Sequence, residues 1–158
     1  MPGNNPAEVN IIDQIKTTLG LFRNTDNVTF RVQWPHESKV IVYADKEHIN
    51  GIFSNLFKNG IQSIPSAREG VIKVQIIVKS DTVVISVSDN GTGIPDELQK
   101  RLFTPNFTTK TSGMGLGLSI VKRYIENANG KIWFESEADK GSTFYIELPL
   151  MYTVEKPL

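Results

Sequence analysis

Two glycine clusters contain residue types that could bind a phosphate-bearing ligand. They are Asp89-Asn90-Gly91-Thr92-Gly93-Ile94 and Ser112-Gly113-Met114-Gly115-Leu116-Gly117-Leu118. Upstream of both clusters, Asn55 and Asn59 are four residues apart in a segment with helical periodicity, so they share one helix face. A carboxylate, two amides and two glycine-rich loops together predict an ATP site.

The first cluster has two interpretations. Asn90-Gly91 after a strand is typical of a hairpin turn, but a second strand would have to follow, and Pro95 instead suits the start of a helix. Gly91 and Gly93 would allow positive φ and let a flat ligand approach the backbone. Asp89 could accept a hydrogen bond from the amino group of adenine, where guanine has an acceptor. Taken alone, the motif fits both a turn and a nucleotide site.

The second cluster, with glycines at 113, 115 and 117, leads into a helix predicted over residues 116–129. Free backbone N–H groups at a helix N-terminus favour phosphate, and the alternative is a flexible glycine-rich loop. The spacing matches neither a Rossmann fingerprint nor a P-loop. The chain also lacks the His-Arg-Asp and Asp-Phe-Gly motifs of eukaryotic-type protein kinases.

Magnesium and the terminal phosphate have candidate ligands of their own. One amide oxygen from Asn55 or Asn59, phosphate oxygens and water would complete a Mg²⁺ shell, although two asparagines taken alone favour an exposed polar stripe. Lys110, which follows Thr108-Thr109, could contact the terminal phosphate as a point charge or be a surface lysine in a loop.

Periodicity predicts the elements that must position these residues. Helices are expected over residues 8–22, 46–64 and 116–129, with Asp45 as the N-cap of the second and a short helix after Pro95. Strands are expected at 27–33, 40–43, 71–79, 82–88, 131–137 and 143–148. The order predicts an α/β fold with a mixed sheet and helices on one face. The long irregular stretch 89–114 is typical of a functional lid or phosphate loop.

Composition excludes several classes of function. The 158 residues suit one domain, predicted at 8–150 between a lead-in at 1–7 and a tail at 151–158. Lys+Arg and Asp+Glu are both 17 with no evident basic stripe, so we expect no nucleic-acid partner. The absence of cysteine excludes thiol catalysis, cysteine-ligated zinc and disulfides. No apolar run reaches membrane-spanning length, and we expect no direct membrane contact by this segment.

Together, the motifs resemble the ATP-binding catalytic domain of sensor histidine kinases, in the ATPase superfamily of DNA gyrase, Hsp90, histidine kinases and MutL. Asp45 to Ile64 is similar to the N box, Asp89 to Gly93 to the G1 box, Arg101 to Phe107 to the F box and Gly113 to Leu118 to the G2 box. Gly141-Ser142-Thr143-Phe144 is similar to the last glycine motif. The resemblance implies a two-layer α/β sandwich of Bergerat type with a flexible ATP lid.

The resemblance also implies residue roles. Asn59 would bind Mg²⁺, Asp89 would bind the adenine amino group, and Asn59 and Lys110 would act in catalysis. Ser142 and Thr143 are further candidates beside the adenine. The full set of implied ATP-binding residues is Asn55, Lys58, Asn59, Asp89, Gly91, Gly93, Ile94, Phe103, Thr108, Thr109, Lys110, Gly113, Met114, Gly115, Leu116, Gly117, Leu118 and Thr143.

Three positions depart from the family pattern. Asn55 stands where the ATP-hydrolysing branches carry a glutamate base, which suits a kinase that transfers phosphate rather than hydrolysing ATP. Gly60 replaces a usual alanine and should soften its helix by up to about 1 kcal/mol. Asn106 interrupts the paired phenylalanines of the F box.

The phosphoacceptor is expected outside this chain. His36 lies between two strands and His48 in the first turns of a helix, where we expect it to be solvated. The partners implied are ATP, a histidine-containing dimerisation domain of the same parent chain and a response regulator. The implied location is the cytoplasm, with a parent protein that can be anchored in the inner membrane. Trp34 and Trp133 are expected to pack in the core.

Two rival functions remain open. An anti-sigma-type serine kinase belongs to the same superfamily, and a nucleotide-sensing module would bind ATP without transferring phosphate. A gyrase-like ATPase is disfavoured by Asn55.

Overall fold

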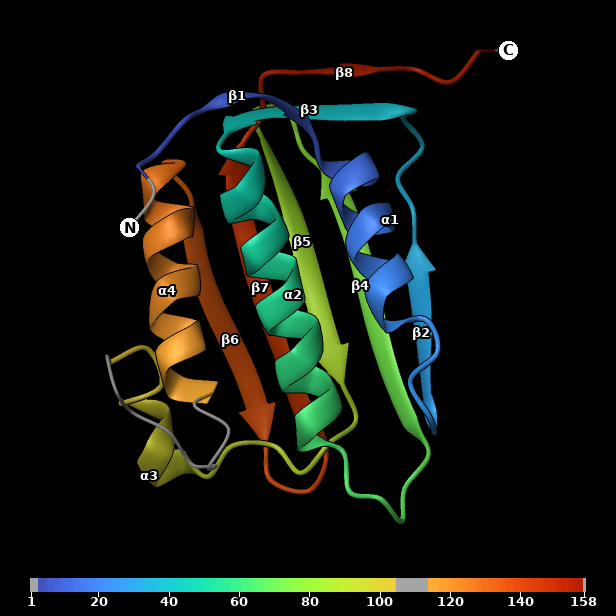
Figure 1. Cartoon of the computed structure of the whole chain (residues 1–158), viewed down its shortest axis with the longest axis vertical. Helices are drawn as coiled ribbons and strands as arrows, with labels where there is room; N and C mark the ends of the chain where they lie inside the picture. The colour runs from blue at the N-terminus through green and yellow to red at the C-terminus, as the bar shows by residue number, and fades with distance from the viewer. Residues whose placement is uncertain (1–2, 105–113, 158) are drawn as a thin grey trace.

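A five-stranded mixed sheet with helices on one face forms the body of the protein (Figure 1). The computed structural model describes residues 3–104 and 114–157, with the side chains of 114–116 left out of that description. The strands, in spatial order, are β2 (Val28–Gln33), β4 (Gly70–Val78), β5 (Thr82–Asp89), β7 (Gly141–Pro149) and β6 (Lys131–Glu137). Only the β2–β4 pair of this sheet is parallel. The predicted α/β fold with a mixed sheet is confirmed.

The helices lie side by side across one face of this sheet (Figure 1). They are α1 (Ile11–Phe22), α2 (Lys46–Ser63) and α4 (Met114–Asn127), and the short α3 (Asp96–Gln99) follows Pro95 as predicted. Asp45 caps α2 as expected, and α2 ends before Pro65. Helix α4 begins two residues earlier than predicted. It ends before Gly130, whose N–H donates to the Ile125 carbonyl at 2.9 Å.

A second sheet, which the sequence did not predict, crosses one end of the molecule. It consists of β1 (Ala7–Asn10), β3 (Lys39–Ala44) and β8 (Tyr152–Val154), in the order β1-β3-β8 and antiparallel throughout. The prediction of a helix from residue 8 is therefore wrong, because Asn10 ends β1 and caps α1 by accepting from the N–H of Ile12 at 3.2 Å. Strand β8 lies within the predicted tail, although the domain boundaries themselves stay a prediction.

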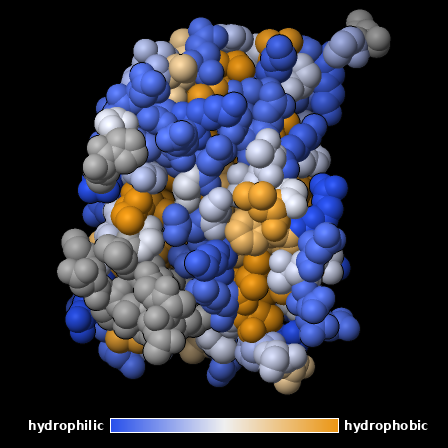
Figure 2. Space-filling model, viewed as in Figure 1, coloured by the Kyte–Doolittle hydropathy of each residue, from blue (hydrophilic) through white to orange (hydrophobic). Residues whose placement is uncertain are grey.

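Aromatic residues fill the core between α2 and the sheet. Phe57 is fully buried and packs against the rings of Phe22, Phe30 and Phe53 at centroid distances of 6.1, 5.4 and 6.1 Å. The outward faces of the helices are mostly hydrophilic, and an apolar strip runs beside the C-terminal half of α2 (Figure 2). This division of apolar and polar faces is what the helical periodicity predicted.

The predicted core positions of the two tryptophans are wrong. Trp34 and Trp133 are 37% and 40% exposed. Trp133 lies on the face of β6 that points away from the helices, and it stacks on Tyr145 of β7 at 5.4 Å. Because side chains alternate along a strand, an apolar residue can occupy the open face of a sheet as readily as the covered one.

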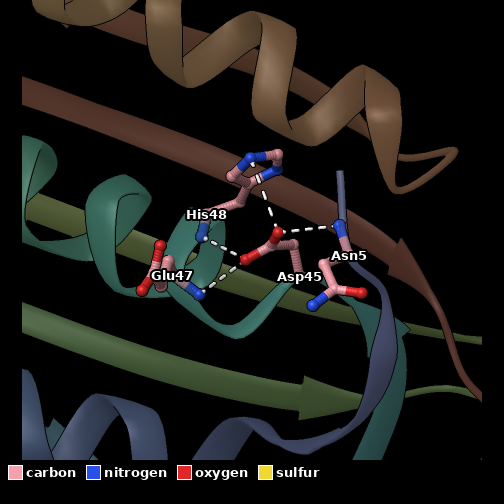
Figure 3. Close-up of polar contacts among 4 residues, drawn as sticks. All are labelled: Asn5, Asp45, Glu47 and His48. Carbon is pink, nitrogen blue, oxygen red and sulfur yellow. Dashed lines mark hydrogen bonds and ion pairs between the residues drawn. The ribbon is translucent and has the colours of Figure 1, made fainter. Parts of the chain in front are cut away.

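The predicted solvated position of His48 is also wrong. His48 is 6% exposed, and its ring stacks on Tyr124 of α4 with 4.0 Å between centroids. Its Nε2 lies 3.8 Å from Oδ2 of Asp45 (Figure 3). Local sequence predicts an exposed His48 ring, but Tyr124, which is distant in sequence, covers the ring.

Asp45 joins the N-terminal segment to α2 (Figure 3). Its carboxylate accepts backbone N–H bonds from Asn5 at 2.9 Å, Glu47 at 2.8 Å and His48 at 3.3 Å. The Asn5 N–H lowers the pKa of Asp45 most, burial acts in the opposite direction, and the N–H groups of His48 and Glu47 lower the pKa further. The folded chain therefore favours the ionised carboxylate.

Replacing Phe57 with alanine should strongly destabilise the fold. The substitution leaves a cavity among three aromatic rings, so we expect a loss of about 3–5 kcal/mol in the free energy of unfolding. Urea denaturation followed by circular dichroism measures this loss. The control, Leu21→Ala at a position 75% exposed, should change stability by no more than about 0.5 kcal/mol. Equal effects of the two substitutions would contradict the assigned core.

Asp45 should make stability depend on pH in the acidic range. Because the folded pKa lies below the ordinary 3.8, the carboxylate stabilises the fold above that value and the contribution is lost as pH falls through the folded pKa. Urea unfolding between about pH 5 and pH 3 should therefore show a smaller decline for Asp45→Asn than for the wild type. Asp45→Ala should also lose the cap, at about 1 kcal/mol near neutral pH. Identical acid profiles for wild type and Asp45→Asn would refute this role.

Candidate nucleotide-binding site

A cavity of about 270 Å³ lies where α2 ends, β5 ends and α4 begins. In Figure 1 these three ends lie in the lower part of the molecule, with the start of α4 beside α3. The polar residues that line the cavity are Asn59, Ser63, Asp89, Thr92 and Ser142, and the large apolar ones are Ile94, Leu98, Leu102, Leu118 and Phe144. Gly93 and Pro95 are the other described residues of the lining. Apolar walls with a few convergent polar groups are typical of a small-molecule site.

The pairing of β5 with β7 decides which side chains reach the cavity. Asp89 is opposite Ser142, and Ser88 is opposite Thr143. Because strand side chains alternate, Asp89 and Ser142 line the cavity, whereas Ser88 and Thr143 lie on the open face and hydrogen-bond to each other at 2.8 Å. The structure therefore brings Ser142 to the cavity and does not bring Thr143 there, a distinction that strand alternation could have predicted.

Several polar contacts hold the loop after β5. Oδ1 of Asp89 accepts from the Gly91 N–H at 2.9 Å, and Arg68 donates to the carbonyls of Asn90 at 2.5 Å and Gly91 at 2.9 Å. The Asn90 side chain accepts from Val71 N–H at 2.8 Å. These hydrogen bonds hold the backbone of residues 89–91, and therefore the position of the Asp89 carboxylate.

The glycines of the first cluster serve the protein's own packing. Gly93 has a φ of 74° in the left-handed region, whereas Gly91 is not among the positive-φ residues. A Cβ on Gly91 would collide with Oγ of Ser63, and one on Gly93 would collide with the carbonyl oxygen of Glu137. Of Gly91 and Gly93, only Gly93 has the expected positive φ. The atoms that approach these two glycines closely belong to the protein itself, at Ser63 and Glu137.

Asn59 and Asn55 occupy different environments on α2. Asn59 is 6% exposed, and its Nδ2 has no hydrogen-bond partner in the described part of the chain. A flip of this amide would exchange its nitrogen and oxygen and offer the oxygen to a metal ion. Asn55 instead donates to the Gly51 carbonyl at 2.7 Å, and its Oδ1 would lie 2.7 Å from a Cβ on Gly117. Gly117 therefore permits α2 and α4 to approach.

Other predicted residues lie near the cavity without lining it. Lys58 is exposed on α2. Phe103 packs against Phe134 and Phe144 at 5.8 and 6.5 Å, and Lys122 Nζ lies 5.9 Å from its ring centroid. Leu102, the preceding residue, lines the cavity instead.

Some lining residues were missed, and part of the second cluster lies outside the described residues. Ser63 is four residues after Asn59 on the same helix, so helical spacing could have identified it. Leu98, Leu102 and Phe144 carry no chemical signal in sequence. Met114, Gly115 and Leu116 lie at the start of α4. The predicted residues Thr108, Thr109, Lys110 and Gly113 fall outside the described ranges, as do all of residues 105–113 of the predicted irregular stretch 89–114.

Comparison with known proteins identifies the family. Residues 44–151 match the family of histidine kinase-, DNA gyrase B- and HSP90-like ATPases, and the chain belongs to this family. It is 34% identical over 140 residues to sporulation kinase C of Bacillus subtilis, covering 89% of this chain and 32% of that protein. The chain thus spans about a third of the length of this curated relative.

Solved structures agree with this assignment. The nucleotide-free catalytic domain of histidine kinase ThkA superposes with a TM-score of 0.81 at 34% identity, covering 92% of this chain and 95% of that one. ThkA in complex with the response regulator protein TrrA gives a TM-score of 0.76 at 31% identity, over 92% of this chain and 42% of that one. The chain has the fold of the histidine kinase catalytic ATPase domain. No helix in the described ranges is long and apolar enough to cross a membrane.

Substituting Gly93 tests the backbone at the cavity. Gly93→Ala imposes a Cβ at positive φ and against the Glu137 carbonyl, so we expect a loss of more than about 1 kcal/mol in unfolding free energy. The matched control is Gly20→Ala in α1, where a Cβ meets nothing within 4 Å and should stabilise the helix by about 0.5–1 kcal/mol. Thermal denaturation of both variants should shift Tm in opposite directions. A Gly93→Ala variant as stable as the wild type would contradict the assigned backbone conformation.

Proposed function

We propose that this domain binds Mg·ATP in the cavity and presents the γ-phosphate to a histidine on a separate dimerisation domain of the same parent chain. The observation that carries the proposal is that the Asp89 carboxylate and the Asn59 amide, whose Nδ2 has no partner among the described residues, converge in a cavity with apolar walls. One group suits the amino edge of adenine, and the other suits a metal that accompanies the phosphates.

Adenine fits the end of the cavity that contains Asp89. The ring would lie between apolar side chains such as Ile94 and Leu118, while the carboxylate accepts from its N6 amino group. Guanine has a carbonyl oxygen in place of this amino group. That oxygen and the Asp89 carboxylate are both acceptors, so neither would receive a hydrogen bond. An unpaired buried acceptor costs enough free energy to give strong discrimination.

The phosphates would extend from the cavity toward the start of α4. Backbone N–H groups at the N-terminus of α4 favour negative charge, and Asn55, Lys58 and Lys110 are the proposed neighbours of the phosphates. Asn59 would hold Mg²⁺ through its amide oxygen, with phosphate oxygens and water as the other ligands. Bound Mg²⁺ would stabilise the charge on the transferring phosphoryl group.

The phosphoacceptor would come from another part of the parent protein. His48 is buried against Tyr124, and His36 is exposed with Nε2 3.2 Å from Glu155, so neither lies at the cavity. The greater length of the curated relative is consistent with further domains in a parent protein. The complex of the similar kinase ThkA with a response regulator supports a response regulator as the downstream partner.

The direct experiment follows γ-labelled phosphate from ATP. The domain is mixed with the dimerisation segment of its parent protein, and the label is then tested for chemical stability. Label on that segment that is labile in acid and stable in alkali is the expected result. Acid-stable label would favour a serine kinase, and ATP binding without any transfer would favour a nucleotide sensor. Either result overturns the histidine assignment.

Asp89→Asn should weaken ATP binding and reduce base selectivity. Loss of a charge-assisted hydrogen bond to N6 should lower AMP-PNP affinity by about tenfold or more, and an amide that can also donate should narrow the preference over GMP-PNP. Isothermal titration calorimetry with both analogues measures these effects. Asp81→Asn, an exposed carboxylate in the β4–β5 hairpin, is the matched control and should bind as the wild type does. Unchanged selectivity in Asp89→Asn would contradict the proposed contact.

A further inference from the structure

The open face of the sheet, opposite the helices, has an ordered row of polar side chains. The register aligns Arg31 of β2, Lys73 of β4, Ser88 of β5, Thr143 of β7 and Glu135 of β6 across the strands. Cations thus lie toward one edge of the sheet and small hydroxyl side chains at its centre. The proposed nucleotide contacts do not use this face.

The neighbouring row turns the centre of this face into a hollow. It consists of Gln33, Gln75, Ser86, Tyr145 and Trp133, one from each of the five strands. Small serine and threonine side chains between longer ones leave a hollow of about 400 Å³. This volume lies within the range of sites for small molecules, about 300–1,000 Å³.

The two cations at the edge of the hollow have no counter-ion within the part of the chain that the structure describes. Arg31 and Lys73 are exposed neighbours on adjacent strands, and neither has an ion pair or side-chain hydrogen bond to another described residue. Like charges placed directly opposite each other in a sheet are destabilising. Glu135, in the same row but on the opposite edge strand, accepts a hydrogen bond from the Tyr145 hydroxyl, and Glu137 pairs with Lys140 at 3.2 Å. An anion in the hollow would relieve this repulsion.

An aromatic ring borders the opposite side of the hollow. Tyr145 lines it, whereas Trp133, on the edge strand beyond, stacks on Tyr145 with an interplanar angle of 10°. The tyrosine ring therefore has one face against Trp133 and the other toward the hollow. Tyr145 lies two strands and two residues away from Lys73, which is about 12 Å between their Cα positions, so the lysine side chain and a ring with one anionic group together span the gap.

We propose that this hollow is a second binding site, for a small planar ring that carries a phosphate or carboxylate group. Arg31 and Lys73 bind the anionic group, and the hydroxyls of Ser88 and Thr143 lie beneath it. The ring stacks on the free face of Tyr145. The site backs onto the nucleotide cavity through one sheet thickness, because Ser88 and Thr143 adjoin Asp89 and Ser142 in sequence and point the other way.

Phenyl phosphate is the probe that tests this site. A ¹⁵N–¹H NMR titration of the whole domain, with Mg·AMP-PNP present to occupy the nucleotide cavity, should show saturable shifts at the amides of Ser86, Ser88, Thr143 and Tyr145. We expect a Kd of about 1 mM, in keeping with the size of the probe. Inorganic phosphate has the anionic group without the ring, and phenol has the ring without the phosphate. Each should bind at least about tenfold more weakly than phenyl phosphate. Benzoate separates a preference for carboxylate from one for phosphate.

Variants show whether the shifts report the proposed contacts. The double substitution Arg31→Gln with Lys73→Gln should weaken phenyl phosphate at least about tenfold and leave AMP-PNP binding unchanged. Lys79→Gln, an exposed lysine in the β4–β5 turn, is the control and should have no effect. Shifts without saturation, or equal binding by the double variant, would overturn the proposal. Failure to bind AMP-PNP is a separate result that bears only on the nucleotide cavity.

Discussion

The antiparallel register of β5 and β7 is the constraint on which the nucleotide site depends. It places Asp89 opposite Ser142 beneath α2 and sends the preceding pair, Ser88 and Thr143, to the open face. A slip of one residue in either strand would exchange covered and open positions along it. The buried run of Val83, Ile85 and Val87 opposes such a slip, because it would bring these apolar side chains into water. Core packing therefore determines where the carboxylate lies.

Helix α2 joins the site to the opposite end of the molecule. It begins at the carboxylate of Asp45, which also holds the N-terminal segment, and carries Asn59 into the cavity about 21 Å further along its axis. Gly60 was expected only to soften this helix. In the structure a Cβ there would lie 3.1 Å from Ile72 and 3.6 Å from the Asp89 side chain, so glycine allows α2 to approach the strands beside the site.

Local patterns predicted most of the fold, and nonlocal contacts account for what they missed. The alternating strands β4 to β7 followed from periodicity, whereas the convergence of Asn59 with Asp89 was what the resemblance to histidine kinases implied. Strands β1 and β8 have only 4 and 3 residues and depend on pairing with β3, so no local signal marks them. The burial of His48 likewise requires Tyr124 from α4. The alternation of side chains along β7 was enough to predict that Ser142 and Thr143 lie on opposite faces of the sheet, so that only one of them can line the cavity.

A crystal structure of the domain with Mg·AMP-PNP tests the central claim most directly. The account predicts adenine in the cavity with N6 within hydrogen-bonding distance, about 2.7–3.2 Å, of the Asp89 carboxylate, and the metal bound by the Asn59 amide oxygen. Adenine bound elsewhere, or held in the cavity with its N6 directed away from Asp89, would contradict the account.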